Sequence, residues 1–280
     1  MNPHSAQPKP HRPDSVAAPT RPRPAFPVRL EGIGAPGPIA RPVPAAPSGV
    51  TTAARYPAAA SVPTGLGLDS SAVRQAMVTR LAAQGLSHPA VLQALAAVER
   101  HRFVDSALVN QAYEDTSLPI GLGQTISKPS VVGRMLELLL EGRASPPGRV
   151  LEIGTGCGYQ SALLARLVRE VYSLERLRGL HDKARDNLRP LRLHNVHLIL
   201  GDGMLGYPRG AAYDAILSAA SGEFIPQAWL DQLALGGRLV APVAQAPGRQ
   251  SLVVVDRTAQ GFVRTVLEAV HFVPLKSGVA

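Results

Sequence analysis

Cysteine is almost absent from this chain of 280 residues, which contains one, Cys157. A single cysteine cannot form an intrachain disulfide, and its scarcity favours a reducing compartment, the cytoplasm. No histidine lies nearby in the sequence to activate the thiol, so Cys157 is a poor candidate for a nucleophile. No cluster of His, Cys, Asp or Glu has metal-site spacing either, and we expect no metal.

Long apolar runs are also missing. The most apolar stretches, LELLLEG at 136–142 and LARLVREVYSL at 164–174, are interrupted by charge. A membrane-spanning helix needs about 18 consecutive apolar residues, and a secretory signal needs an apolar segment of about 7–15. The sequence therefore predicts no membrane partner.

The first 66 residues lack a sustained apolar pattern. Residues 1–63 hold 15 of the 26 prolines and seven Lys or Arg against two acids, which is more than half of the net charge of +9. Such a segment buries too little apolar surface to offset its ordering entropy. We predict a disordered, basic, proline-rich extension at 1–66 and a folded domain at 67–280. A basic arm is able to bind nucleic acid, but a solvated extension with no dedicated partner is the simpler interpretation.

Two kinds of periodicity divide the folded part. Apolar residues at helical spacing predict helices over 69–84, 87–103 and 127–140, and the glycine-rich segment 121–130 reads as a loop. From residue 149, short apolar strands alternate with helices, and the predicted strands cover 149–154, 170–175, 196–203, 213–219, 236–243, 251–257 and 269–275. This alternation predicts an α/β, Rossmann-like, doubly wound and mostly parallel sheet with helices on both faces.

A glycine loop follows the first of these strands. Residues 151–160 read LEIGTGCGYQ, so that Gly154, Gly156 and Gly158 form a G-x-G-x-G pattern. The dinucleotide fingerprint places its third glycine at 159, where Tyr159 stands, and no P-loop motif is present. Glycines at the carboxyl end of a strand allow close approach of a ligand, although a nucleotide-binding sheet of another kind has the same feature.

Acidic residues accompany three successive strand ends. Glu152 precedes the loop, Glu175 ends the next strand, and Asp202 follows the third. An acid in the position of Glu175 accepts hydrogen bonds from ribose hydroxyls, and Asp202 is able to accept one from an adenine amine. A carboxylate at Glu152 favours a cationic or amine-bearing ligand over a pyrophosphate. Together they indicate S-adenosyl-L-methionine.

Several segments together resemble the protein-L-isoaspartate O-methyltransferases. They read AYEDTSLPIGLGQTISKPSVV, VLEIGTGCGYQSALLA, VYSLER, GDG, GGRLVAPV and FVPL, and the likeness runs from about Met77 to Leu275. The family belongs to the class I methyltransferases, and its enzymes methylate the free α-carboxylate of L-isoaspartyl residues in damaged proteins and peptides. The resulting ester cyclises to a succinimide, which is able to reopen as normal aspartate.

The resemblance implies roles for individual residues. Ser127 matches the family's active-site serine. The implied cofactor contacts are Glu152, Gly154, Thr155, Gly156, Gly158, Glu175, Asp202 and Gly203, and the implied substrate contacts are Tyr113, Gln124, Thr125 and Ala220. The chain departs from the family's usual residues at Lys128, at Gly133, and at 219–221, where Ala-Ala-Ser replaces Thr-Ala-Ala.

The chemistry of an α-carboxylate removes the need for a general base. Its pKa is about 3.3–3.7, so the acceptor is already an anion at neutral pH. Ser127 is able to donate a hydrogen bond to it, but a serine two residues before Pro129 could instead cap the helix that opens there. Two other readings stay open: a methyltransferase of the same fold with a different acceptor, and a non-catalytic cofactor-binding or nucleic-acid-associated protein. We expect a monomer that does not bind nucleic acid.

Overall fold

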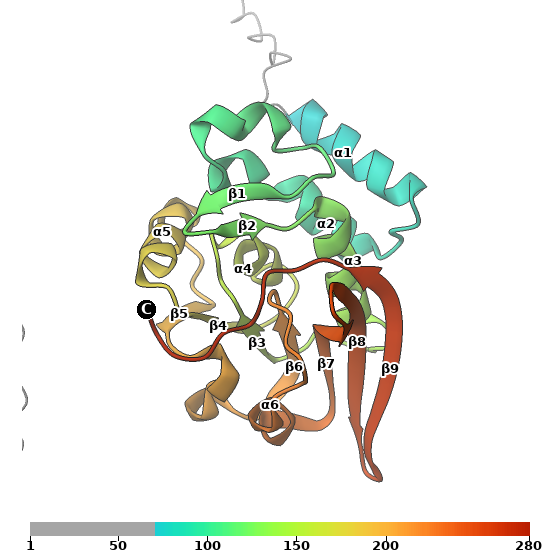
Figure 1. The fold of residues 1–280 in the computed structure, drawn as a ribbon. Helices are drawn as coiled ribbons and strands as arrows, with labels where there is room; N and C mark the ends of the chain where they lie inside the picture. Colours follow the sequence, from blue (N-terminus) through green and yellow to red (C-terminus); the bar gives the residue numbers. More distant parts are fainter. Residues whose placement is uncertain (1–70) are drawn as a thin grey trace, which may run out of the picture. The chain divides into compact units, whose positions relative to one another are not determined.

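The computed structural model describes residues 71–280, so the predicted extension at 1–66 lies outside the described residues. In these residues a seven-stranded sheet has the order β5-β4-β3-β6-β7-β8-β9 (Figure 1). Its strands are β3 (Arg149–Ile153), β4 (Glu170–Glu175), β5 (Val196–Leu200), β6 (Tyr213–Ser218), β7 (Leu233–Ala246), β8 (Arg249–Thr258) and β9 (Gly261–Val270). The strands from β5 to β7 pair in parallel, and β7, β8 and β9 pair antiparallel. The predicted fold class is confirmed.

Helices cover both faces of the sheet, and each face has its own core. In β3, Val150 belongs to the core shared with helices α1 to α5, whereas Leu151 and Ile153 belong to the core on the other side. This alternation is the period of two expected of a strand that is buried on both faces. The helices are α1 (Ser71–Ala83), α2 (Pro89–Ala97), α3 (Pro129–Leu140), α4 (Tyr159–Leu164), α5 (Arg178–Leu188) and α6 (Gln227–Gln232).

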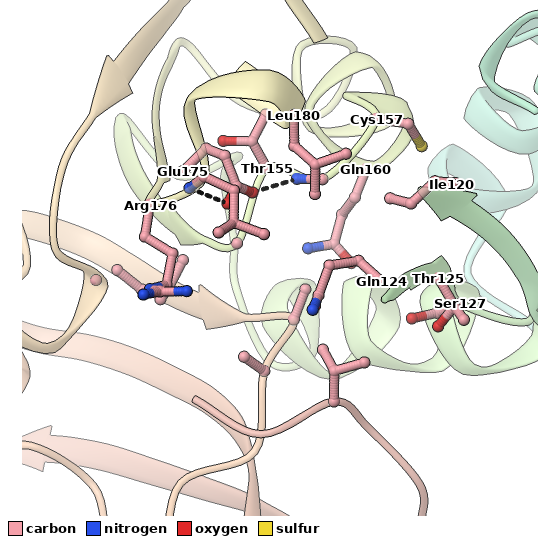
Figure 2. Close-up of a pocket in the computed structure, with 18 of the residues that line it drawn as sticks. Ile120, Gln124, Thr125, Ser127, Thr155, Cys157, Gln160, Glu175, Arg176 and Leu180 are labelled. Carbon is pink, nitrogen blue, oxygen red and sulfur yellow. Dashed lines mark hydrogen bonds between the residues drawn. The ribbon is translucent and has the colours of Figure 1, made fainter. Parts of the chain in front are cut away.

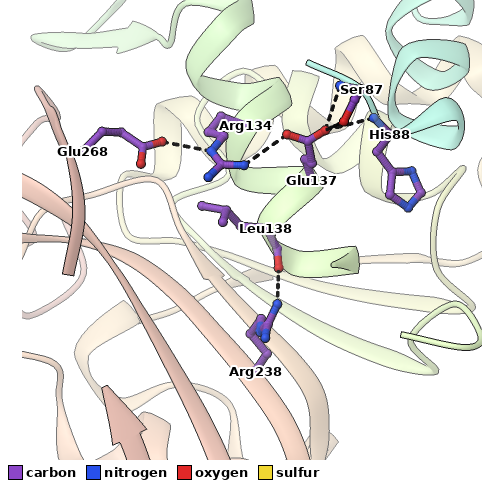
Figure 3. A network of polar contacts seen from close by, with 7 residues as sticks. All are labelled: Ser87, His88, Arg134, Glu137, Leu138, Arg238 and Glu268. Atoms are coloured by element: carbon purple, nitrogen blue, oxygen red, sulfur yellow. Dashed lines mark hydrogen bonds and ion pairs between the residues drawn. The ribbon is translucent and has the colours of Figure 1, made fainter. Parts of the chain in front are cut away.

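A buried carboxylate joins the first helices to α3. Glu137 of α3 accepts hydrogen bonds from the backbone N–H of Ser87 (2.8 Å) and His88 (2.9 Å) and from the Ser87 hydroxyl (3.0 Å) (Figure 3). Arg134 bridges Glu137 to Glu268 of β9, at 3.1 Å from each. Serine is a favoured N-cap residue, and Ser87 lies just ahead of α2. The structure instead has His88 at the N-cap position, and Ser87 binds α3.

Two sequence predictions of local structure are wrong. The glycine-rich segment predicted as a loop contains half of a hairpin, in which β1 (Leu118–Gly121) pairs antiparallel with β2 (Gln124–Ile126). The predicted strand at 269–275 is not one, because the last strand, β9, ends at Val270. Within residues 71–280, the β-pairing of the following coil is limited to an isolated bridge between Pro274 and Ser221. Its course instead follows the carboxyl edge of the sheet, which places it over the site described next.

Candidate functional site

A cavity of about 300 Å³ opens at the carboxyl ends of β3, β4 and β6. It is lined by the glycine loop after β3, the β1–β2 hairpin with the segment up to Ser127, and the coil 273–276. In Figure 2, Glu175 lies at one side of the cavity and Ser127 at the other, with Gln124 and Gln160 between them. This is the edge at which open α/β sheets bind ligands.

The glycine loop is held against the neighbouring strand. The backbone N–H groups of Gly154 and Thr155 both donate to the carbonyl of Leu174, at 2.8 and 3.1 Å. Gly154 and Gly156 have φ angles of +88° and +57°, which side chains rarely tolerate. A Cβ at Gly156 would lie 3.2 Å from Cδ1 of Ile120, so the loop passes close beneath the hairpin. Gly154, Thr155 and Gly156 all line the cavity.

Glu175 ends β4 with its carboxylate in the cavity wall. Its Oε2 accepts from the Gly156 N–H at 2.8 Å, and its Oε1 accepts from the Leu177 N–H at 2.9 Å (Figure 2). The residue is 5% exposed. Because each carboxylate oxygen accepts more than one hydrogen bond, both retain capacity for a pair of ligand hydroxyls. The structure places Glu175 where the sequence predicted it.

Glu152 differs from the prediction. It is completely buried and does not line the cavity. Its carboxylate accepts hydrogen bonds from the hydroxyls of Ser161 and Ser173 and from Nε2 of Gln160. Burial raises the pKa of Glu152 to about 7, against the lowering effect of these donors. The acid supports Gln160, which lines the cavity, and has no direct access to a ligand there.

Asp202 also lies outside the cavity lining, whereas its neighbour Gly203 is part of it. Oδ1 of Asp202 accepts from the Met204 N–H at 2.8 Å, and Oδ2 accepts from the Gly278 N–H at 2.7 Å. The C-terminal coil is fixed further by Arg176, whose Nε donates to the Gly278 carbonyl at 2.9 Å. Arg176 also lines the cavity, so it joins this coil to the cavity wall.

Gly158 serves packing rather than ligand approach. It is the N-cap of α4 with a φ of +91°, and it does not line the cavity. A Cβ there would lie 3.0 Å from Leu188 and 3.4 Å from Ala184, both on α5. The third glycine of the motif thus allows α4 and α5 to approach each other.

Ser127 lines the cavity and does not cap α3. The N-cap residue is Lys128, and it makes no side-chain capping bond. Asp115 fills that role, accepting from the N–H (2.8 Å) and the hydroxyl (2.7 Å) of Ser130. Within residues 71–280 the Ser127 hydroxyl has no hydrogen-bond partner, so it is free to bind a ligand.

Three of the four predicted substrate residues reach the cavity. Gln124, Thr125 and Ala220 line it. Tyr113 is buried elsewhere, and its hydroxyl lies 2.7 Å from Nδ1 of His101. The sequence offered no basis for choosing it over its neighbours, because buried and exposed residues alternate irregularly along this loop.

Several lining residues were not predicted, among them Ile120, Leu122, Gln160 and the coil 273–276. Gln160 follows the glycine loop directly and the coil contains the FVPL segment, so position in the sequence could have indicated both. Cys157 also lines the cavity, but it is buried, and burial raises the pKa of its thiol. A neutral thiol is a weak nucleophile. In the described part of the chain no three His, Cys, Asp or Glu residues are grouped as a metal site.

Comparison of the sequence with known proteins identifies the family to which this chain belongs. The profile described as Protein-L-isoaspartate(D-aspartate) O-methyltransferase (PCMT) matches residues 72–280. A curated protein-L-isoaspartate O-methyltransferase from Methylibium petroleiphilum is 55% identical, over 94% of this chain and 99% of its own. One from Ralstonia nicotianae is 50% identical, over 95% of this chain and 88% of its own.

Solved structures agree with this assignment. A protein-L-isoaspartate O-methyltransferase superposes with a TM-score of 0.66 at 26% identity, covering 74% of this chain and 67% of its own. A Plasmodium falciparum structure described by the same activity, in complex with S-adenosyl-L-homocysteine, has a TM-score of 0.62 at 24% identity. It covers 72% of this chain and 98% of its own, and it shares the fold. The chain therefore belongs to the protein-L-isoaspartate(D-aspartate) O-methyltransferase family.

Proposed function

We propose that this protein repairs damaged proteins by transferring a methyl group from S-adenosyl-L-methionine to the free α-carboxylate of L-isoaspartyl residues. One observation carries the proposal beyond family membership. One side of a single cavity holds Glu175, an acid at a strand end that suits ribose hydroxyls, and the other side holds Ser127, whose hydroxyl has no hydrogen-bond partner in the described residues (Figure 2). Such an arrangement suits two reactants that must meet end to end.

The cofactor side of the cavity fits an adenosyl ligand. S-adenosyl-L-methionine supplies an electrophilic methyl group on a positively charged sulfur. We infer that Glu175 binds its ribose hydroxyls, and that the backbone of Gly154, Thr155 and Gly156 packs against its amino-acid part. Gly203 lies at the adenine end, where its carbonyl accepts from the indole of Trp229 at 2.7 Å and is thereby fixed in place. Direct contact is not proposed for Glu152, Gly158 or the side chain of Asp202.

The acceptor side of the cavity binds and orients without removing a proton. The acceptor carboxylate is ionised at neutral pH, because its pKa is about 3.3–3.7. We infer that the Ser127 hydroxyl donates a hydrogen bond to it, while Gln124, Thr125 and Ala220 bound the space for the flanking peptide. Holding the reacting groups in line supplies part of the roughly 7–11 kcal/mol that orientation can contribute.

The setting in which the protein works is a further proposal. We infer a monomer in the cytoplasm that acts on polypeptides and does not bind nucleic acid. The single cysteine is consistent with a reducing compartment. Among residues 71–280, no helix has the length and apolar character needed to cross a bilayer.

A methyl-transfer assay with two matched peptides tests this function. Labelled S-adenosyl-L-methionine is supplied with an isoaspartyl peptide or with its aspartyl twin, and the product is treated with base. We expect label only on the isoaspartyl peptide, in a base-labile ester. Equal labelling of both peptides, or a base-stable product, would mean that this fold acts on a different acceptor. Binding of the cofactor without any transfer would indicate a non-catalytic protein.

A further inference from the structure

We propose that Arg100 is a positioning residue of the acceptor site, which fixes the backbone at Ser127 and supplies positive charge behind the wall of the cavity. The inference rests on the proposed function, because the acceptor carboxylate is the anion that this charge favours. Arg100 opens the 3₁₀ helix Arg100–Phe103 and is completely buried.

The guanidinium of Arg100 fastens the active-site segment at three points. Its Nε donates to the carbonyl of Ala112 at 2.8 Å. Its Nη2 donates to the carbonyl of Ser127 at 2.7 Å, with a longer contact of 3.4 Å to that of Thr116. These carbonyls span the whole segment 112–127, which includes the β1–β2 hairpin. One side chain therefore determines where Ser127 stands relative to the rest of the cavity.

No acid forms an ion pair with the guanidinium of Arg100 in the described part of the chain. Within residues 71–280 Arg100 takes part in no ion pair, and its Nη1 has no hydrogen-bond partner. Asp115, an acid of the same segment, hydrogen-bonds Ser130 and not Arg100, although its charge favours the protonated guanidinium from a distance. Burying an unpaired cation costs several kcal/mol, and such a cost persists where the rest of the structure enforces it, often at functional sites. A buried cation without a hydrogen-bonded counter-ion raises the electrostatic potential of its surroundings.

Tyr159 connects this charge to the cavity. Cζ of Arg100 lies 4.8 Å from the centroid of the Tyr159 ring, and Tyr159 lines the cavity together with Ser127. Burial raises the pKa of the Tyr159 hydroxyl to about 12, so the ring stays neutral and does not cancel the arginine. Charges in a site of low dielectric are screened weakly, so the cation acts on whatever binds beyond the ring.

The two reactants respond to this potential with opposite signs. The acceptor carboxylate is negative before transfer and neutral as an ester, so Arg100 favours binding of the acceptor over retention of the product. The sulfur of S-adenosyl-L-methionine is positive and that of S-adenosyl-L-homocysteine is neutral, so Arg100 disfavours the first relative to the second. The ratio of their dissociation constants therefore reports the potential at the site without any acceptor present.

Calorimetric titration of both cofactor forms tests the proposal. In Arg100→Met, we expect affinity for S-adenosyl-L-methionine relative to S-adenosyl-L-homocysteine to rise roughly threefold to tenfold. Arg100→Gln, which keeps an amide donor for the Ser127 carbonyl, should show the same shift if the methionine variant does not fold. Arg100→Lys keeps the charge but not the three-carbonyl geometry, so its ratio should stay within about twofold of wild type while kcat falls.

Arg80→Met is the matched control. Nη2 of Arg80 also donates to a carbonyl of this segment, that of Tyr113 at 2.8 Å. Arg80 is exposed, so water screens its charge and its loss should leave the ratio of the two dissociation constants unchanged. Equal weakening of both ligands in the neutral Arg100 variants would overturn the charge role and leave Arg100 a structural residue. A ratio that shifts in Arg100→Lys as in Arg100→Met would also contradict it. Failure of the wild type to methylate isoaspartyl peptides would instead refute the proposed function, since the ratio needs no acceptor.

Discussion

Two side chains with contrasting surroundings define the site at the scale of the residue. Ser127 lines the cavity with a hydroxyl that binds nothing else in the described part of the chain. Glu152, which the sequence predicted as a cofactor contact, is buried and accepts hydrogen bonds from three side chains. A strand-end position identified the acid but not its direction, because the period-two alternation of β3 decides which way a side chain points.

Replacing Ser127 with alanine tests its role as a donor. A hydrogen bond to a charged group contributes about 1.5–3 kcal/mol, so Ser127→Ala should lower kcat/KM for an isoaspartyl peptide roughly tenfold to a hundredfold. Affinity for S-adenosyl-L-homocysteine, measured by calorimetry, should not change. Ser130→Ala, which removes only a hydroxyl bound to Asp115, should keep wild-type turnover. Full activity in Ser127→Ala would show that the hydroxyl does not act on the acceptor.

The stability of the protein should depend on the ionisation of Glu152. Its pKa is raised from 4.5 to about 7 in the folded state. Its contribution to stability is therefore fully present below about pH 4.5 and lost as the pH rises through about 7. Denaturant unfolding of wild type and Glu152→Gln across this range should show the wild type losing roughly 3 kcal/mol relative to the variant. Parallel curves for the two proteins would contradict the buried, raised-pKa state.

At the scale of the element, hydrogen bonds between distant segments hold the helices around the sheet. Glu137 takes three donors from the connection between α1 and α2, and Arg238 donates to the carbonyl of Leu138 at 2.9 Å (Figure 3). Helix α3 is thus fixed on two sides, and it begins at Pro129, two residues after Ser127. Rigidity of this helix is a condition for a well-placed active-site segment.

Removal of the Glu137 carboxylate measures this attachment. Glu137→Ala leaves two backbone N–H groups and a hydroxyl without their acceptor, so we expect a loss of about 2–4 kcal/mol in the free energy of unfolding. Glu268→Ala is the control, because it ends only a partly exposed ion pair with Arg134 and should cost less than about 1 kcal/mol. Equal losses of unfolding free energy for the two substitutions, measured by urea unfolding, would show that the buried hydrogen bonds of Glu137 do not stabilise the protein.

Elements were predictable from the sequence to different degrees. The strands β3 to β6 follow from short apolar runs, and α3 follows from its apolar stripe. The hairpin β1–β2 could not be predicted in the same way, because its residues are polar and glycine-rich and form a separate two-stranded sheet. The sequence predicts Asp202 as a ligand contact. No local pattern indicates that its carboxylate instead accepts from the N–H of Gly278, 76 residues later.

At the scale of the whole molecule, the sheet gathers residues from distant parts of the chain at one edge. Ser127 precedes the first parallel strand, Glu175 ends the second, and the coil at 273–276 follows the last strand, yet all three line one cavity. Residues 64–280 carry 22 Lys or Arg against 18 acids, an excess that favours the approach of an anionic acceptor. We thus assign one end of the cavity to the positively charged methyl donor and the other end to the negatively charged acceptor.

Comparison of a free and a blocked acceptor tests that assignment most directly. An isoaspartyl peptide with a free α-carboxylate and the same peptide with this group converted to the α-amide are each incubated with labelled S-adenosyl-L-methionine, and initial rates are measured. The amide is of similar size but carries no charge. We expect transfer to the free carboxylate and none above background to the amide. Comparable rates with both peptides would contradict it.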